Sequence, residues 1–118
     1  MKIKLKSLSV LFFFLCFSNV HAAGWVAHSA KIVTVNPGYG DDDSLYIGYE
    51  EGSGSNMGCP SSGQVSYKRA DFPNVELFMR IYATAMTSLV HDKPVGIQQG
   101  SPAGNGDCTQ ADTLIMFK

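Results

Sequence analysis

The two cysteines Cys59 and Cys108 constrain this chain more than any other feature of its sequence. A third cysteine, Cys16, lies in a segment that we expect to be cleaved off. An even pair of cysteines in a small exported domain predicts a disulfide bond. That bond closes a loop of 108 − 59 = 49 residue steps, which stabilises the folded state by about 4 kcal/mol in the chain-entropy model. Two free thiols, or half of a metal site, are the alternatives.

Residues 1–22 have the three parts of a secretory signal peptide. The segment starts with three lysines, continues with an almost wholly apolar run over 8–17, and ends in Val20-His21-Ala22, which suits a cleavage site. A run of about ten apolar residues is too short to cross the hydrocarbon core of a bilayer. We therefore expect cleavage after Ala22, export to the periplasm or out of the cell, and one mature domain over 23–118. An uncleaved N-terminal anchor is the alternative.

The charge balance argues against a nucleic-acid partner. The chain has 9 Lys+Arg and 10 Asp+Glu, for a net charge of -1. Removal of residues 1–22 takes away three lysines and no acid, which leaves (9 − 3) − 10 = −4. Proteins that bind nucleic acids usually carry a basic excess. The 45% of hydrophobic residues are enough for a packed core and exclude a disordered chain.

Hydrophobic patterning predicts five strands and one helix. The strands are expected over 25–35, 45–49, 64–68, 95–98 and 113–117. The helix is expected between the third and fourth strands, with Asp71 as N-cap and an end near His91, ahead of Pro94. The order β-β-β-α-β-β predicts an α+β, mostly β domain, either a small OB-like barrel or an antiparallel sheet with one long helix. The last segment is nearly all apolar, so we expect it to lie centrally or at a contact surface.

The predicted helix has two apolar faces. One face spans about 120° and is expected to pack on the core; its members are Val75, Phe78, Met79, Tyr82, Met86, Leu89 and Val90. Leu77 and Ile81 project roughly opposite, among polar residues. We interpret these two as a candidate interface with a partner or a second copy. The alternative is that a loop of the same chain covers them.

The chemistry-bearing residues form no spaced catalytic motif. The sequence has no Gly-x-Ser-x-Gly, Ser-x-x-Lys or His-Glu-x-x-His pattern. His28 and His91 are candidate general bases without an evident nucleophile, and Glu50 and Glu51 would point to opposite faces of a strand. We therefore expect no catalysis, no cofactor and no metal site.

An acidic run and three tyrosines are candidates for binding. Asp41-Asp42-Asp43 lacks the alternate spacing of a calcium loop, so we expect a solvated hairpin tip, with a protein-binding acidic loop as the alternative. Tyr46, Tyr49 and Tyr67 fall in or beside predicted strands and are candidate ligand contacts, because aromatic rings on a β face can stack on a ligand. Packing of these rings within the sheet is the alternative.

The region 70–98 resembles the helix-then-strand part of the OB-fold B subunits of AB-type bacterial toxins, of the subtilase cytotoxin type. The residues that carry the resemblance are Phe72-Pro73-Asn74-Val75-Glu76-Leu77-Phe78-Met79-Arg80, Tyr82-Ala83 and Lys93-Pro94-Val95-Gly96-Ile97. The resemblance implies an OB fold, rings of five subunits with the helices lining a pore, and recognition of glycans in a rim pocket. The same layout also fits many small exported bacterial proteins with no known role.

These observations together predict a non-catalytic, exported binding or self-associating domain, with glycan binding as the specific expectation. The alternative is a monomeric periplasmic protein that binds or inhibits a partner.

Overall fold

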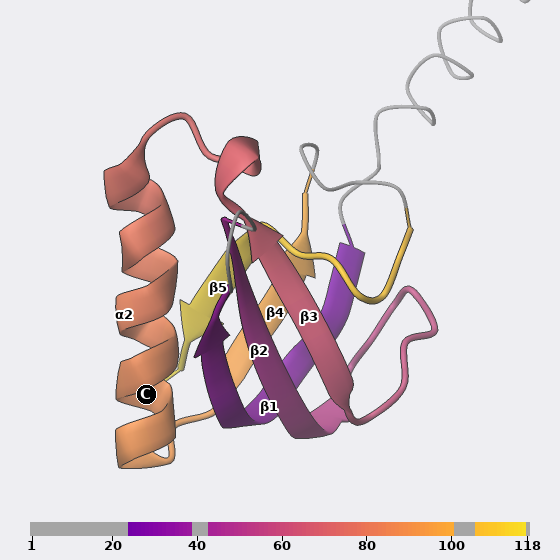
Figure 1. Cartoon of the computed structure of the whole chain (residues 1–118). Coiled ribbons are helices and arrows are strands. Elements are labelled where there is room, and N and C mark those ends of the chain that lie inside the picture. Colours follow the sequence, from indigo (N-terminus) through magenta and orange to yellow (C-terminus); the bar gives the residue numbers. More distant parts are fainter. Residues whose placement is uncertain (1–23, 39–42, 101–105, 118) are drawn as a thin grey trace, which may run out of the picture.

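The computed structural model describes residues 24–38, 43–100 and 106–117. Its elements, in chain order, are β1 (Gly24–Pro37), β2 (Ser44–Ser53), β3 (Gly63–Lys68), the short 3-10 helix η1 (Arg69–Asp71), α2 (Val75–His91), β4 (Val95–Gln99) and β5 (Thr113–Met116). The five strands pair antiparallel in the order β3-β2-β1-β4-β5, and α2 lies along the sheet against β1 and β5 (Figure 1). The predicted mostly β class, with one helix after the third strand, is confirmed. The expected signal segment and the acids Asp41 and Asp42 lie outside the described residues.

The long strand β1 lies in the middle of the sheet and pairs with β4 on one side and with β2 on the other. Its first part, from Gly24 to Ala30, pairs with β4, and its later part, from Ser29 to Pro37, pairs with β2. The register shifts twice in each pairing. Such irregularities bend a strand and increase its twist, so the sheet is curved rather than flat.

Hydrogen bonds join the β3 edge of the sheet to the segment that comes just before β5. The N–H of Ser66 in β3 donates to the carbonyl of Thr109 (2.7 Å), and the N–H of Ala111 donates to the carbonyl of Ser66 (3.1 Å). These bonds form an isolated parallel bridge between Ser66 and Gln110. The named strands are therefore an open sheet, whose β3 edge is tied to the chain just before β5.

Alternate residues of the strands form the core. The fully buried side chains on the inner face include Val26, Leu45, Ile47, Val65, Tyr67, Val95 and Ile97. Burial of one such aliphatic side chain stabilises the fold by about 1.5–3 kcal/mol. β5 lies at the sheet edge and not centrally, so of the two positions expected for it only the contact surface stays a prediction. Its Leu114 is buried, whereas Ile115 and Met116 remain exposed.

The N-cap of α2 lies three residues later in the chain than predicted. Asp71 ends η1, and Phe72 is extended (φ -114, ψ 139), so no helix can run through this segment. Asn74 is the true N-cap: its backbone is extended and its Oδ1 accepts the N–H of Leu77 at 3.0 Å. An asparagine in this role satisfies an N–H group that the first helical turn leaves unpaired.

The face of α2 that packs on the sheet is only in part the one that was predicted, since Phe78 and Tyr82 of the predicted face are partly buried against the core. Its buried residues are Ile81, Ala85 and Ser88, with Leu77 half-buried beside them. The expected core face is largely open: Val75 is 53% exposed, Met79 50% and Val90 70%. The small side chains at positions 85 and 88 let the helix approach the strands closely, and this close approach covers Ile81, which retains 9% of its exposure. Ile81 therefore belongs to the core, and its assignment to an interface needs correction.

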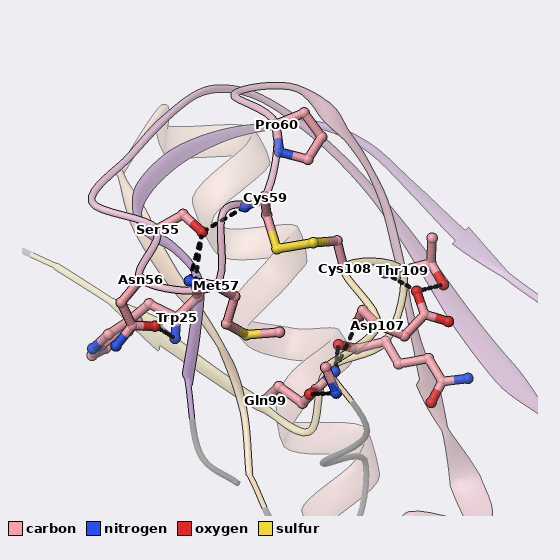
Figure 2. The surroundings of a disulfide bond; sticks show 12 residues. Trp25, Ser55, Asn56, Met57, Cys59, Pro60, Gln99, Asp107, Cys108 and Thr109 are labelled. Atoms are coloured by element: carbon pink, nitrogen blue, oxygen red, sulfur yellow. Dashed lines mark hydrogen bonds between the residues drawn. A yellow bond between two sulfur atoms is a disulfide. The ribbon is translucent and has the colours of Figure 1, made fainter. Parts of the chain in front are cut away.

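One side of the sheet, the loop flank, is covered by the two loops that carry Cys59 and Cys108 and by the disulfide between them. Cys59 and Cys108 are bonded, as predicted, across a separation of 49 residues. Figure 2 shows Ser55 beside this bond, where its Oγ accepts the N–H of Cys59 and donates to the carbonyl of Trp25, both at 3.0 Å. The N–H of Trp25 donates to Asn56 Oδ1 at 2.7 Å. The loop that carries Cys59 is thus fixed to the start of β1.

The loop that carries Cys108 is held by one buried side chain, that of Gln99 at the end of β4. Its Nε2 donates to the carbonyls of Asp107 (2.7 Å) and Gln110 (3.1 Å), and its Oε1 accepts the N–H of Gly106 (2.8 Å). Within the loop, the backbone N–H and then the hydroxyl of Thr109 donate to Asp107 and lower the pKa of its carboxyl. Polar and covalent links therefore order this flank.

Candidate functional site

Two of the three candidate tyrosines belong to the core. Tyr49 is buried, and its hydroxyl donates to the carbonyl of Pro60 at 3.1 Å. Tyr67 is completely buried, and its hydroxyl donates to the carbonyl of Thr113 at 3.0 Å. Burial raises the pKa of both phenols, and for Tyr67 the nearby Asp112 charge adds to the increase. A ligand at the surface cannot reach either ring, so only Tyr46, which is half-buried, remains a candidate contact.

The two histidines occupy different settings. His28 of β1 is exposed, with its ring 4.8 Å from that of Trp25 and 5.5 Å from that of Phe117. These rings lie beside Gly96, where a Cβ atom would collide with the Trp25 ring. His91 is the exposed last residue of α2. The geometry gives His28 an aromatic packing role and pairs neither histidine with a described hydroxyl or carboxylate.

Within the described part of the chain, no three His, Cys, Asp or Glu side chains gather in a way that could hold a metal ion. In that same part, α2 is not long and apolar enough to cross a membrane. Of the acidic run, Asp43 is described and exposed.

Three of the hollows on the described surface could accept a ligand or a partner. The helix-start groove, about 370 Å³, lies between the beginning of α2 and the adjoining ends of β1 and β2. The β2-bulge hollow, about 250 Å³, lies between β1, β2 and the turn over 92–94. The Tyr46 hollow, about 300 Å³, lies on β2 and β3. Neither His28 nor His91 lines any of them.

The β2-bulge hollow contains the most unusual backbone of the described fold. Among the described non-glycine residues only Glu51 (φ 56) and Asp92 (φ 53) have positive φ, and both line this hollow. A left-handed backbone costs an ordinary residue about 1–2 kcal/mol. Residues held in this way gather at ligand sites more often than elsewhere.

Glu51 takes its left-handed conformation at a bulge in the pairing of β1 and β2. It sits where the pairing of β1 and β2 shifts register, between Ser29↔Ser53 and Lys31↔Glu50, and a glycine is the usual residue for a left-handed position in such a bulge. Its carboxylate is exposed and makes no hydrogen bond or ion pair with any described residue. The fold therefore retains a strained acid, open to solvent, at the rim of the hollow.

Asp92 and its neighbours form the opposite wall. Asp92 ends α2 in the left-handed conformation that commonly follows a helix, and its N–H donates to the carbonyl of Ser88. The buried Ser88 hydroxyl donates to the carbonyl of Lys93 at 2.6 Å, so a core residue fixes this turn. Lys31 from β1 lies 3.8 Å from Asp92, with both side chains largely exposed. An exposed pair of this kind adds little stability, and it leaves both charges available to a ligand.

The helix-start groove continues the exposed apolar face of α2. Val75 and Met79 line it together with Phe78 and Leu45. Arg69 stands at its side, where one guanidinium N–H donates to the carbonyl of Phe72 at 3.1 Å. The groove is thus an apolar surface with a cation at its border.

Sequence reasoning missed the β2-bulge hollow. The sequence suggests Glu50 and Glu51 only as adjacent acids on opposite faces of a strand, and it does not connect Lys31 and Asp92 with them. The one local signal is Gly52, since a glycine inside a strand often marks a bulge. The meeting of β1, β2 and the helix end depends on the tertiary fold.

A protein-family model described as "Family of unknown function (DUF5992)" matches residues 6–118 of the chain. Searches of curated proteins and of solved structures gave no match.

Proposed function

We propose that this chain, which belongs to the DUF5992 family, is an exported, non-catalytic binding domain whose β2-bulge hollow takes a glycan. Export is supported by the signal-like segment over 1–22 and by the disulfide, which persists in oxidising compartments. A non-catalytic role is supported by the lack of a spaced catalytic motif in the sequence.

The observation that carries the proposal is the strained backbone of Glu51. A glycine there would have no steric penalty, and residues in strained conformations gather at ligand sites. The carboxylate of Glu51 is exposed and makes no hydrogen bond or ion pair with a described residue, so it is available to a ligand.

The chemistry of the hollow suits a polyhydroxylated ligand. It offers the carboxylates of Glu51 and Asp92, the ammonium groups of Lys31 and Lys93, and the hydroxyl of Ser29. Carboxylates accept and ammonium groups donate hydrogen bonds, so together they match the vicinal hydroxyls of a sugar. The resemblance to toxin B subunits, which implies glycan recognition, points to the same class of ligand.

A glycan array tests the proposal. The secreted protein, with its disulfide intact, is applied to the array, and each retained glycan is measured by calorimetry. Glu51→Gln should weaken binding at least tenfold, because it removes the charge that accepts sugar hydroxyls. Glu76→Gln, at an exposed glutamate in the first turn of α2, is the matched control and should bind as the parent does. Retention of no glycan, or equal effects of the two changes, contradicts the proposal.

The exposed apolar face of α2 favours a second candidate, self-association. Val75, Met79 and Val90 are each at least half exposed on one side of the helix, and apolar surface of this kind marks contact sites. We expect light scattering on a sizing column to give a native mass of several subunits. Met79→Lys with Val90→Lys should yield the monomer without loss of stability. A parent protein that is monomeric at all concentrations contradicts self-association and leaves a partner protein as the remaining candidate for this face.

A further inference from the structure

The charged side chains of the β2-bulge hollow differ in whether they have a partner. Lys31 and Asp92 form an ion pair, with 3.8 Å between Lys31 Nζ and Asp92 Oδ1. Glu51 and Lys93 are both exposed, and neither side chain makes a hydrogen bond or an ion pair with a described residue. The hollow therefore offers one carboxylate and one ammonium group that are open to a ligand, beside a pair whose charges already balance.

Hydrogen bonds to neighbouring segments fix the backbone on both walls of the hollow. Beside Glu51, the N–H of Gly52 donates to the carbonyl of Ser61 at 2.7 Å. On the opposite wall, the N–H of Lys93 donates to the carbonyl of Ser88 at 3.1 Å, and the carbonyl of Lys93 accepts the Ser88 hydroxyl at 2.6 Å. A site whose backbone is already ordered loses less conformational freedom when a ligand binds.

The size of the hollow limits its occupant to a small ligand. Its volume is about 250 Å³, whereas pockets for drug-sized ligands have about 300–1,000 Å³. Ala30, Pro94 and Ser29 complete its lining. A single sugar unit, which combines C–H groups with hydroxyls that donate and accept hydrogen bonds, matches this mixture of apolar and polar groups.

The charges of the hollow argue against three simpler classes of ligand. A divalent cation needs several oxygen ligands, and among the described residues no third His, Cys, Asp or Glu joins Glu51 and Asp92 in a group that could hold a metal ion. A purely anionic ligand would place a like charge beside Glu51, and a purely cationic ligand would place one beside Lys93. Like charges that face one another disfavour binding, so a ligand with one charge of each sign fits best.

We propose that the glycan unit in the β2-bulge hollow is zwitterionic: an amino sugar that carries a carboxylate, with its ammonium group at Glu51 and its carboxylate at Lys93. Hydrogen bonds between ionised groups are roughly twice as strong as those between neutral groups, so these two side chains set the choice among sugars. Lys31, Asp92 and the hydroxyl of Ser29 bind the hydroxyls of the sugar. The inference rests on the proposed function, because it names the class of glycan for that same hollow.

NMR titration of the oxidised, isotope-labelled protein at low salt and pH 6 tests this preference with four related sugars. Muramic acid carries both charges, N-acetylmuramic acid only the carboxylate, glucosamine only the ammonium group, and N-acetylglucosamine neither. We expect muramic acid to shift the backbone amides of Lys31, Glu51 and Lys93, and to bind at least fivefold more tightly than either singly charged sugar. Salt at 1 M should reduce this advantage to less than twofold, because it screens exposed charges.

Two variants assign each charge of the ligand to one side chain. Glu51→Gln should abolish the preference for muramic acid over N-acetylmuramic acid and keep the preference over glucosamine, and Lys93→Gln should do the reverse. Lys68→Gln, at an exposed lysine of β3 that does not line the hollow, is the matched control and should keep both preferences. Ratios between sugars separate these effects from a general loss of affinity, and the same spectra report whether each variant is folded.

The outcomes separate this inference from the proposed function. Equal affinities for the four sugars at this hollow, all weakened by Glu51→Gln, overturn the zwitterionic preference and leave the proposed function standing. Tighter binding of a singly charged sugar than of muramic acid also overturns it. Shifts that avoid Lys31, Glu51 and Lys93, with no effect of either variant, contradict both proposals. An absence of shifts with all four sugars overturns the inference, and retention of other glycans on the array then decides the proposed function separately.

Discussion

The two flanks of the sheet are held in different ways. On the loop flank, a disulfide, the buried amide of Gln99 and the bridge at Ser66 fix the chain. On the helix flank, α2 is fixed by apolar packing of Ile81 and Ala85 and keeps a second apolar face in solvent. The loop flank is held by links within the chain, whereas the helix flank leaves apolar side chains of α2 exposed to solvent. On this ground we propose the helix side, away from the disulfide, as the place where a partner or a second copy binds.

The largest expected effect is the loss of the disulfide on the loop flank. Cys59→Ala with Cys108→Ala should lower the free energy of unfolding by about 4 kcal/mol, because a loop of 49 residue steps is no longer restrained in the unfolded chain. Denaturant unfolding of the parent and the double variant measures this difference. A loss below about 1 kcal/mol would mean that the packed helix flank, and not the disulfide, dominates stability.

Gln99→Ala should lower the free energy of unfolding by about 3 kcal/mol. The change removes three hydrogen bonds from a completely buried side chain and leaves their backbone partners without it. Gln98→Ala is the matched control, since its half-buried side chain makes no hydrogen bond with a described residue, and it should cost less than about 1 kcal/mol. Equal losses of stability from the two variants would show that the hydrogen bonds of Gln99 do not hold the Cys108 loop in place.

On the helix flank, Ile81→Ala should lower the free energy of unfolding by about 2–3 kcal/mol, as for other large core residues. Met79→Ala, on the exposed face of the same helix, should change it by less than about 0.5 kcal/mol in the monomer. Urea unfolding at low protein concentration provides both values. A larger loss of stability from Met79→Ala than from Ile81→Ala would mean that the helix face expected from the sequence packs on the sheet, and it would contradict the orientation of α2 in the structure.

The smallest expected effect is a loss of stability at alkaline pH from Tyr67, which ties β3 to β5. Its folded pKa is raised, first by burial and then by Asp112. Its stabilising contribution is therefore fully present below the unfolded pKa of about 10 and is lost as the pH rises above that value. Unfolding measured from pH 8 to pH 11 should show this decline, and Tyr67→Phe should reduce its slope. An unchanged slope in the variant would show that other groups cause the decline.

Much of the fold could be predicted from the sequence because local patterns encode it. The β-forming segment over 45–49 identified β2, and the cysteine pair identified the disulfide. The facing of α2 could not be predicted in the same way. Periodicity finds both apolar faces, but the choice between them depends on how closely the helix approaches the strands, which Ala85 and Ser88 decide through their small size.

The candidate site was harder to predict than the fold. Tyr46, Tyr49 and Tyr67 are chemically alike in the sequence, and only the register of β2 and β3 shows that the last two point inward. The strain at Glu51 arises where the pairing of β1 and β2 slips, and no single sequence window contains both strands.

The most direct test of the account is to measure Glu51→Gly for stability and glycan affinity in the same preparation. Glycine relieves the left-handed strain at this position and removes the carboxylate. We expect the free energy of unfolding to stay at the parent value or to rise by up to about 1 kcal/mol, while glycan affinity falls at least tenfold. An affinity equal to that of the parent would contradict the central claim, because the strained acid would then have no part in binding.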